Sequence, residues 1–152
     1  MQIVLHEPEI PPNTGNIART CAVTGTPLHL VGPLGFSISD RHLKRAGLDY
    51  WQYLQVSYWD CFEELRQAFP EHRFFFFTTK GKIRYDSVSY KETDFLVFGS
   101  ETRGLPDRIL EAYPEYCLRI PMLTGIRSLN LSNSVALVLY EALRQQGFPG
   151  LV

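Results

Sequence analysis

The chain has 152 residues and a mass of 17.5 kDa, which is enough for one compact domain and too little for two ordinary ones. Hydrophobic residues make up 45% and charged residues 20% of the sequence, as in ordinary globular proteins. The net charge of −1 argues against a uniformly basic nucleic-acid binder, although it leaves room for a local basic patch.

Cysteine and histidine spacing predicts no metal site, and no segment predicts a membrane span. Cys21, Cys61 and Cys117 lack the C-x2-C pairing of zinc sites, so we expect them to be core thiols in a reducing compartment. The four histidines are equally scattered. The N-terminus reaches Glu7 too early for a secretory signal, and no apolar run approaches the roughly 18 residues of a membrane helix. We therefore expect a cytoplasmic protein that binds neither metal nor membrane.

The first part of the chain reads as a strand, a helix and a strand. Residues 2–5 predict a short buried strand, which the proline-rich loop EPEIPPNTGN follows. Asn13 or Thr14 is expected to cap the helix, and Gly25 to end it. Residues 28–31 predict the second strand. This order is typical of a βαβ unit, whose crossover is almost always right-handed.

The middle of the chain predicts a basic helix, a strand and a second helix. Residues 50–58 alternate enough to predict the strand, and residues 60–69 show an amphipathic pattern that ends at Pro70. The short basic helix is expected at residues 40–46, where three cationic side chains share one face: Arg41, Lys44 and Arg45.

Two strands in the second half are expected to be buried on both faces. Residues 74–79, FFFFTT, are apolar or β-branched, and residues 94–98 lead into the loop GSETRGLP. Between them, KGKIRYDSVSY is expected to be a polar loop. Pro106 then opens a helix that runs to about Ala112, and residues 116–120 predict the last strand.

The last helix, which begins near Asn130, has no charged residue up to Tyr140, whereas an ordinary surface helix carries charge on about half its circumference. We therefore expect both of its faces to be covered. Ser128 to Asn133 supply a polar start that can cap the helix or face a ligand. One apolar stripe comprises Leu131, Val135, Val138, Leu139 and Ala142, while Leu137 and Tyr140 lie on another.

The alternation of strands and helices, without a hairpin signal, predicts a single α/β domain over residues 1–152. Its sheet is expected to be mainly parallel, with helices on both faces. Ligands of such sheets bind at the carboxyl ends of the strands. Four polar loops follow predicted strands here: PPNTGNIAR, TTKGK, GSETRGLP and PMLTGIRSLNLSN.

These loops exclude several common sites. None has the form GxxxxGKS/T or GxGxxG, so neither a Walker nucleotidase nor a standard dinucleotide site is indicated. Ser100 and Ser128 lack a neighbouring histidine, which disfavours a serine hydrolase. Glu101 is either a general base or a cap for the backbone N–H groups of the following turn, and we favour the cap.

Three segments resemble, in order and spacing, the motifs of the SPOUT class of knotted RNA methyltransferases, which use S-adenosylmethionine (AdoMet). They are NTGNIAR at residues 13–19, FGSETRGLP at 98–106, and IPM followed by SLNLSNSVALVLYEALRQ near the C-terminus. KRAGLDYW at 44–51 and GFPG at 147–150 resemble the subfamily that methylates the 2′-hydroxyl of the wobble nucleotide of tRNA. The likeness covers essentially the whole chain.

This resemblance implies a fold that periodicity does not reveal, namely a deep trefoil knot in the C-terminal half. It also implies a homodimer, in which a second copy would cover the outer face of the last helix. The cofactor would be AdoMet, bound within the knot. Its implied binding residues are Phe77, Thr78, Thr79, Gly99, Ser100, Glu101, Gly104, Ile120, Met122, Ser128, Leu129 and Asn133, with Leu129 standing where family members often have methionine.

The resemblance makes Arg19 the catalytic candidate, either to orient the target phosphate or to assist deprotonation of the hydroxyl. Because the pKa of an arginine side chain lies far above neutral, we favour orientation and charge stabilisation. From the residues alone, Arg19 could equally be a solvent-facing side chain paired with Glu7 or Glu9.

The implied activity is 2′-O-methylation of cytidine or uridine 34 of tRNA, with the anticodon stem-loop as the bound partner. The alternatives are the same chemistry at another tRNA or rRNA position, or a catalytically idle RNA-binding dimer. Lys80, Lys82 and Arg84 form a second basic candidate patch. The candidate RNA-binding residues are Asn13, Asn16, Arg41, Lys44, Arg45, Arg103 and Arg127.

Overall fold

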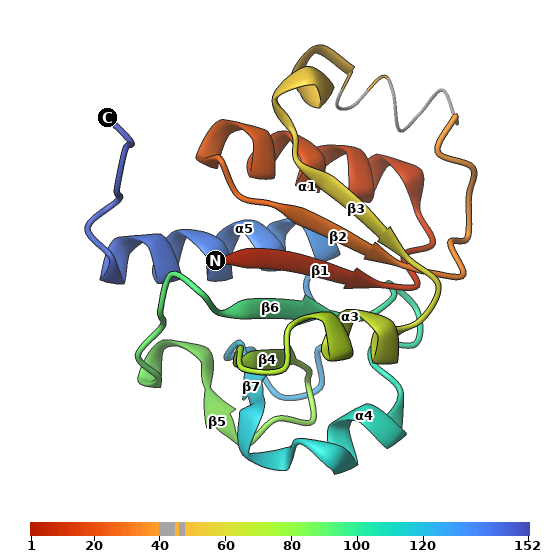
Figure 1. The fold of residues 1–152 in the computed structure, drawn as a ribbon. Coiled ribbons are helices and arrows are strands. Elements are labelled where there is room, and N and C mark those ends of the chain that lie inside the picture. Colours follow the sequence, from red (N-terminus) through yellow and green to blue (C-terminus); the bar gives the residue numbers. More distant parts are fainter. Residues whose placement is uncertain (40–44, 46–47) are drawn as a thin grey trace.

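The computed structural model describes residues 1–39, 45 and 48–152, and contains a seven-stranded sheet whose paired neighbours are all parallel (Figure 1). The strand order is β3-β2-β1-β6-β4-β7-β5. The strands are β1 (Gln2–His6), β2 (Leu28–Val31), β3 (Val56–Trp59), β4 (Phe74–Phe77), β5 (Ile83–Arg84), β6 (Phe95–Phe98) and β7 (Cys117–Arg119). The α/β class and the parallel sheet are thus confirmed.

Helices cover both faces of the sheet (Figure 1), as predicted. The α-helices are α1 (Pro11–Thr24), α3 (Phe62–Ala68), α4 (Asp107–Ala112) and α5 (Leu131–Gln145), and the 3-10 helices are η1 (Leu48–Tyr53), η2 (Tyr85–Ser87) and η3 (Pro114–Tyr116). Helices α1 and α5 pack on one face, and α3 and α4 on the other. No helix in the described ranges has the length and apolar character needed to cross a membrane.

The run of four phenylalanines in β4 serves both layers of the core. Phe75 and Phe77 pack with α1 and α5, whereas Phe74 and Phe76 pack with α3 and α4. All four side chains are buried because successive residues of a strand point to opposite faces of the sheet. The neighbouring β6 is buried in the same way.

Helix α1 begins earlier than the sequence predicted. It starts at Pro11, with Ile10 at the N-cap position and no capping side chain, so Asn13 and Thr14 are buried residues inside the helix rather than caps. A proline fits the first turn because the N–H group that it lacks has no partner within the helix there. The predicted end is confirmed, since Gly25 adopts a left-handed φ of 66°.

Two predictions in the middle of the chain were wrong. Residues 50–58 do not form one strand, because η1 occupies the first part and β3 begins only at Val56. The predicted polar loop after β4 contains β5, whose two residues pair with β7. A strand of two residues leaves no periodicity in the sequence. The predicted basic helix at residues 40–46 lies largely outside the described residues.

Other boundaries move by one or two residues, and Pro106 is the N-cap of α4 rather than its first residue.

Helix α5 shows the two predicted faces, but only one of them is covered by this chain. Val138 and Leu139 are fully buried, whereas Leu137 is 39% and Tyr140 45% exposed. Asn130 caps the helix by accepting hydrogen bonds from the backbone N–H groups of Ser132 and Asn133.

Candidate functional site

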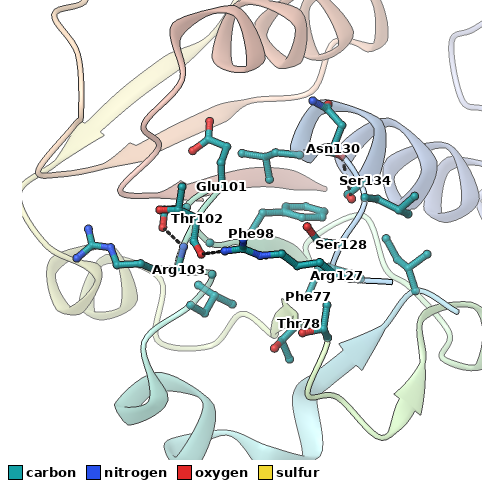
Figure 2. Close-up of a pocket in the computed structure, with 18 of the residues that line it drawn as sticks. Phe77, Thr78, Phe98, Glu101, Thr102, Arg103, Arg127, Ser128, Asn130 and Ser134 are labelled. Atoms are coloured by element: carbon teal, nitrogen blue, oxygen red, sulfur yellow. Dashed lines mark hydrogen bonds between the residues drawn. The ribbon is translucent and has the colours of Figure 1, made fainter. Parts of the chain in front are cut away.

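A cavity of about 410 Å³ opens at the carboxyl ends of β4, β6 and β7, beside the starts of α1 and α5 (Figure 2). Three of the four polar loops singled out in the sequence form most of its wall. All the residues predicted to bind a cofactor line it except Asn133: Phe77, Thr78, Thr79, Gly99, Ser100, Glu101, Gly104, Ile120, Met122, Ser128 and Leu129. Asn133 is exposed, and its backbone N–H bonds to the Asn130 cap instead.

Two aromatic rings form an apolar part of the wall. Phe77 and Phe98 are paired neighbours at the ends of β4 and β6, and their rings stack 4.7 Å apart at an interplanar angle of 12°. Both line the cavity, together with Leu105 and Ile120. The cavity therefore combines an apolar surface with the polar loops that follow these strands.

The loop after β6 is folded into a turn that only glycine permits. A Cβ at Gly99 would lie 2.1 Å from the carbonyl carbon of Gly104, so no larger side chain fits there. Gly104 itself has a left-handed φ of 69° and donates its N–H to the Ser100 carbonyl. This close approach brings the backbone of residues 99–105 to the cavity wall.

Glu101 ties this loop to the segment that precedes α1. Its carboxylate accepts hydrogen bonds from the backbone N–H groups of Glu9, at 2.8 Å, and Ile10, at 3.0 Å. The side-chain amide of Asn13 donates a third, at 3.3 Å. The structural role that we favoured for Glu101 is therefore confirmed, but the predicted partner was wrong, because Glu101 binds a segment about ninety residues earlier rather than the following turn.

Asn13 extends this connection to the third loop. Its side-chain oxygen accepts a hydrogen bond of 3.1 Å from the amide of Asn130, the residue that caps α5. Glu101, Asn13 and Asn130 thus join the loop after β6, the start of α1 and the start of α5 in one hydrogen-bonded series. Asn13 is buried, so it is placed to hold these segments together.

Two arginines stand at the edge of the cavity. Arg127 donates a hydrogen bond of 3.3 Å to the Thr102 carbonyl (Figure 2). Arg103 is largely exposed and lies 3.6 Å from a Glu7 oxygen and 3.8 Å from a Glu9 oxygen. The predicted alternative for Arg19 was right that the side chain faces solvent but wrong about its partners, because Arg103 lies beside Glu7 and Glu9.

Arg19 does not line the cavity. It lies on the exposed side of α1, with its guanidinium carbon 4.7 Å from the centre of the Tyr50 ring. Asn16 is exposed on the same helix, and Arg45 is exposed. Arg41 and Lys44 fall outside the described residues. The structure therefore separates the predicted catalytic residue from the predicted cofactor site of the same chain.

Two residues of the second basic patch are paired with carboxylates. Lys80 lies at the cavity wall, 2.6 Å from Asp107, and Arg84 bonds Asp86 at 2.6 Å. Within the described ranges, no group of three His, Cys, Asp or Glu side chains is placed to hold a metal ion.

Several lining residues were missed by the sequence analysis, although most belong to the loops that it singled out. Ile10 was missed because it lies at the cavity through contacts distant in sequence, such as the hydrogen bond from its N–H group to Glu101. The missed residues are Ile10, Phe98, Thr102, Leu105, Leu110, Asn130, Leu131 and Ser134, whereas Lys80 belonged to the second basic candidate patch.

Comparison with known proteins gives consistent matches. The model of the SpoU rRNA Methylase family matches residues 1–140. A tRNA (cytidine(34)-2′-O)-methyltransferase of Methylovorus glucosotrophus is 54% identical, over 99% of this chain and 98% of its own length. A solved structure described as giving insights into 2-OH methylation of C/U34 on tRNA is 46% identical, with a TM-score of 0.92, over 96% of this chain and 95% of that chain. A SpoU methyltransferase of Streptomyces viridochromogenes, solved with AdoMet, has a TM-score of 0.86 at 22% identity over 96% of this chain and 57% of its own, which shows a shared fold.

Proposed function

Because this chain belongs to the SpoU rRNA methylase family, we propose that it transfers a methyl group from AdoMet to the ribose 2′-hydroxyl of nucleotide 34, the wobble cytidine or uridine of tRNA, in the cytoplasm. The observation that carries the proposal is the convergence of the three family-like segments on one cavity. The relatives named for this reaction match nearly the full length of the chain.

The cavity has the properties that an AdoMet site needs. Its volume of about 410 Å³ lies within the range of small-molecule pockets, about 300 to 1,000 Å³. The apolar wall around Phe98, Leu105 and Ile120 suits a purine ring, and the close backbone approach at Gly99 exposes amide and carbonyl groups to a ligand. When bound, AdoMet supplies an electrophilic methyl group on a sulfonium sulfur.

The protein must hold the ribose oxygen in line with that methyl group. Such positioning contributes on the order of 7 to 11 kcal/mol in favourable cases. We assign Arg19 to this task, because its planar guanidinium can bind the target phosphate through two N–H groups and stabilise charge that develops on the oxygen. Arg103 and Arg127, at the edge of the cavity, are assigned to phosphates of the anticodon stem-loop, together with Asn16 and the basic segment that contains Arg45.

We propose that a second copy of the chain completes this site, since Arg19 does not line the cavity of its own chain. The surface offers an apolar contact for that copy. Leu137 and Tyr140 are exposed on α5, and the exposed Phe148 ring lies 6.4 Å from the Tyr140 ring. We propose that this surface forms a homodimer in which each Arg19 serves the partner's cavity.

A charged residue in this surface should separate the two copies. We expect Tyr140→Asp to give a folded monomer by sedimentation, because the buried face of α5 is unchanged. Its turnover should fall at least about 100-fold, the lower end of the range for removal of a donor that stabilises developing charge. Tyr58→Asp, which alters a similarly exposed tyrosine on β3, is the control and should remain dimeric. A fully active Tyr140→Asp dimer would contradict this assignment.

We also propose that the C-terminal half forms a deep trefoil knot, with α5 passing through a loop of the chain. The strand order supports the knot. After β4 the chain runs to β5, at one edge of the sheet, and then crosses back past β4 to form β6 on the other side of β4. After β7, α5 packs against α1 on the face that covers β1 and β6. A crystal structure that traces residues 119–131 continuously tests the threading.

The reaction is tested by incubating the protein with methyl-labelled AdoMet and bulk tRNA, then mapping the labelled nucleotide. Label on the ribose of nucleotide 34 is the expected result. Label on a base would refute the reaction class, and label on another ribose would refute the proposed position. Binding of tRNA without transfer would instead indicate a catalytically idle RNA-binding dimer.

A further inference from the structure

Among the described residues, Arg19 contacts one aromatic ring, that of Tyr50, to which the proposed reaction assigns no role. Helix η1 packs along α1, and Tyr50 of η1 lies beneath the Arg19 guanidinium, at 4.7 Å from ring centre to guanidinium carbon. Tyr50 is half-buried and therefore held by its surroundings, whereas Arg19 is exposed. Tyr50 also belongs to the KRAGLDYW segment, whose described residues form no part of the cavity wall.

A ring and a carboxylate hold a guanidinium in different ways. A carboxylate bonds to the N–H groups at its edge and so occupies the donors that would bind a phosphate. An aromatic ring attracts the flat face of the guanidinium and leaves the N–H groups at the edge available. Glu7 and Glu9 lie 3.6 and 3.8 Å from Arg103, too far for hydrogen bonds, so they do not occupy its N–H groups.

We propose that Tyr50 is the positioning residue for Arg19, holding the plane of its guanidinium while its N–H groups bind the phosphate or the ribose oxygen of the target nucleotide. This inference rests on the proposed function, because it assumes that Arg19 acts in methyl transfer. Tyr50 acts through Arg19 and has no contact with the cavity. It restricts the rotamers of a long side chain that would otherwise be free in solvent, so that less conformational entropy is lost when RNA binds.

The aromatic face, rather than the bulk or the hydroxyl group of Tyr50, is therefore the feature that matters. Tyr50→Phe keeps the ring and should retain turnover to within about twofold, since only the hydroxyl is lost. Tyr50→Leu keeps an apolar side chain but removes the ring, and its turnover should fall about tenfold, a change within the range of one cation–π contact. Tyr53→Leu, an exposed tyrosine of the same 3-10 helix, is the matched control and should match the wild type.

The experiment measures single-turnover methyl transfer to tRNA, AdoMet affinity and the thermal midpoint for the wild type, Tyr50→Phe, Tyr50→Leu, Tyr53→Leu and Arg19→Ala. The proposal expects Tyr50→Leu to lower the rate at saturating tRNA while AdoMet affinity and the thermal midpoint stay unchanged. In the Arg19→Ala background, Tyr50→Leu should lower the residual rate no further, because Tyr50 acts only through Arg19.

The outcomes separate this inference from the proposed function. An inactive wild type, or a fully active Arg19→Ala variant, overturns the role of Arg19 itself. If Arg19→Ala is impaired but Tyr50→Leu transfers methyl groups at the wild-type rate, the positioning role is overturned. Equal loss in Tyr50→Phe and Tyr50→Leu also overturns it, because the ring is retained in the first. If Tyr50→Leu is impaired only as far as its thermal midpoint falls, Tyr50 has a structural role alone.

Discussion

The two ends of the parallel sheet use polar side chains in opposite ways. At the amino end, Asp94 is fully buried and receives two hydrogen bonds from Arg73 and one from the backbone N–H of Lys91. At the carboxyl end, Arg103 and Arg127 stand around an open cavity of about 410 Å³. Polar groups that satisfy one another stabilise the fold, whereas those that face open space are available to a ligand. Substitutions at the amino end should therefore change stability alone, and those at the carboxyl end should also change ligand binding.

The largest effect is expected from Arg73→Leu at the amino end. This change leaves the Asp94 carboxylate buried without its charged partner, which typically destabilises a protein by about 3 to 5 kcal/mol. Chemical denaturation should show that loss in the free energy of unfolding. AdoMet affinity of the folded fraction should be unchanged, because the cavity lies at the other end of the sheet.

The matched control is Arg84→Leu. Arg84 bonds Asp86 through the same two guanidinium nitrogens, but both side chains are more exposed than the Asp94 carboxylate. Because water screens an exposed pair, the unfolding midpoint of Arg84→Leu should stay close to that of the wild type. An equal loss of stability in both variants would show that burial of Asp94 is not the cause.

The next effect is a loss of stability in acid that depends on His29. This imidazole accepts a hydrogen bond from the Trp59 indole N–H on Nδ1, so its Nε2 carries the proton that faces Gln2. Burial lowers the pKa of His29 to about 4, from an ordinary value near 6.5. As the pH falls, the unfolded chain therefore binds a proton at His29 before the folded chain does. The stability that neutral His29 contributes is fully present above about pH 6.5, and on the order of 3 kcal/mol of it is lost as the pH falls towards 4.

Unfolding free energies measured between pH 7 and pH 4 test this expectation. The difference in this pH dependence between wild type and His29→Gln measures the contribution of His29, because glutamine can also accept a hydrogen bond from Trp59 and donate one to Gln2. His6 remains in both proteins, and burial lowers its pKa as well. A pH dependence that is identical in the two proteins would assign the acid sensitivity to groups other than His29.

The sequence predicted the features that depend on local chemistry. Phe74–Phe77 and Phe95–Phe98 are apolar throughout, which is sufficient to predict strands covered on both faces. Gly25 could be predicted as the end of α1 because only glycine adopts a left-handed φ without strain. The polar loops were predicted to meet because the carboxyl ends of parallel strands share one edge of the sheet.

The features that depend on tertiary contacts could not be predicted. The partners of Glu101 lie about ninety residues earlier, and nothing in the GSETRGLP loop indicates which backbone N–H groups it binds. Strand β5 is defined by its pairing with β7, a contact between residues about 35 positions apart in the sequence. The list of cofactor residues came from resemblance to a family, and resemblance also suggested Arg19 without indicating that it lies away from the cavity of its own chain.

The smallest of these stability effects should come from Glu101→Gln at the carboxyl end. The carboxylate accepts from the Glu9 N–H through one oxygen and from the Ile10 N–H through the other, whereas the amide offers a single accepting oxygen. One backbone N–H therefore loses its partner, at a cost of about 1 to 3 kcal/mol in unfolding free energy. Because the same carboxylate joins α1 to the loop after β6, AdoMet affinity should also fall, as measured by calorimetry.

Glu111→Gln, on the exposed side of α4, is the control and should change neither quantity. The change in unfolding free energy, compared with the change in AdoMet affinity, distinguishes the two ends of the sheet. Arg73→Leu should lower the free energy of unfolding and leave AdoMet affinity unchanged. Glu101→Gln should lower both, because the hydrogen bonds of Glu101 shape the cavity wall. If Glu101→Gln lost stability while binding AdoMet as tightly as the wild type, the loop after β6 would hold its shape through the Ser100–Gly104 contact alone. The contrast between a stabilising end and a ligand-binding end would then rest on Arg103 and Arg127 rather than on Glu101.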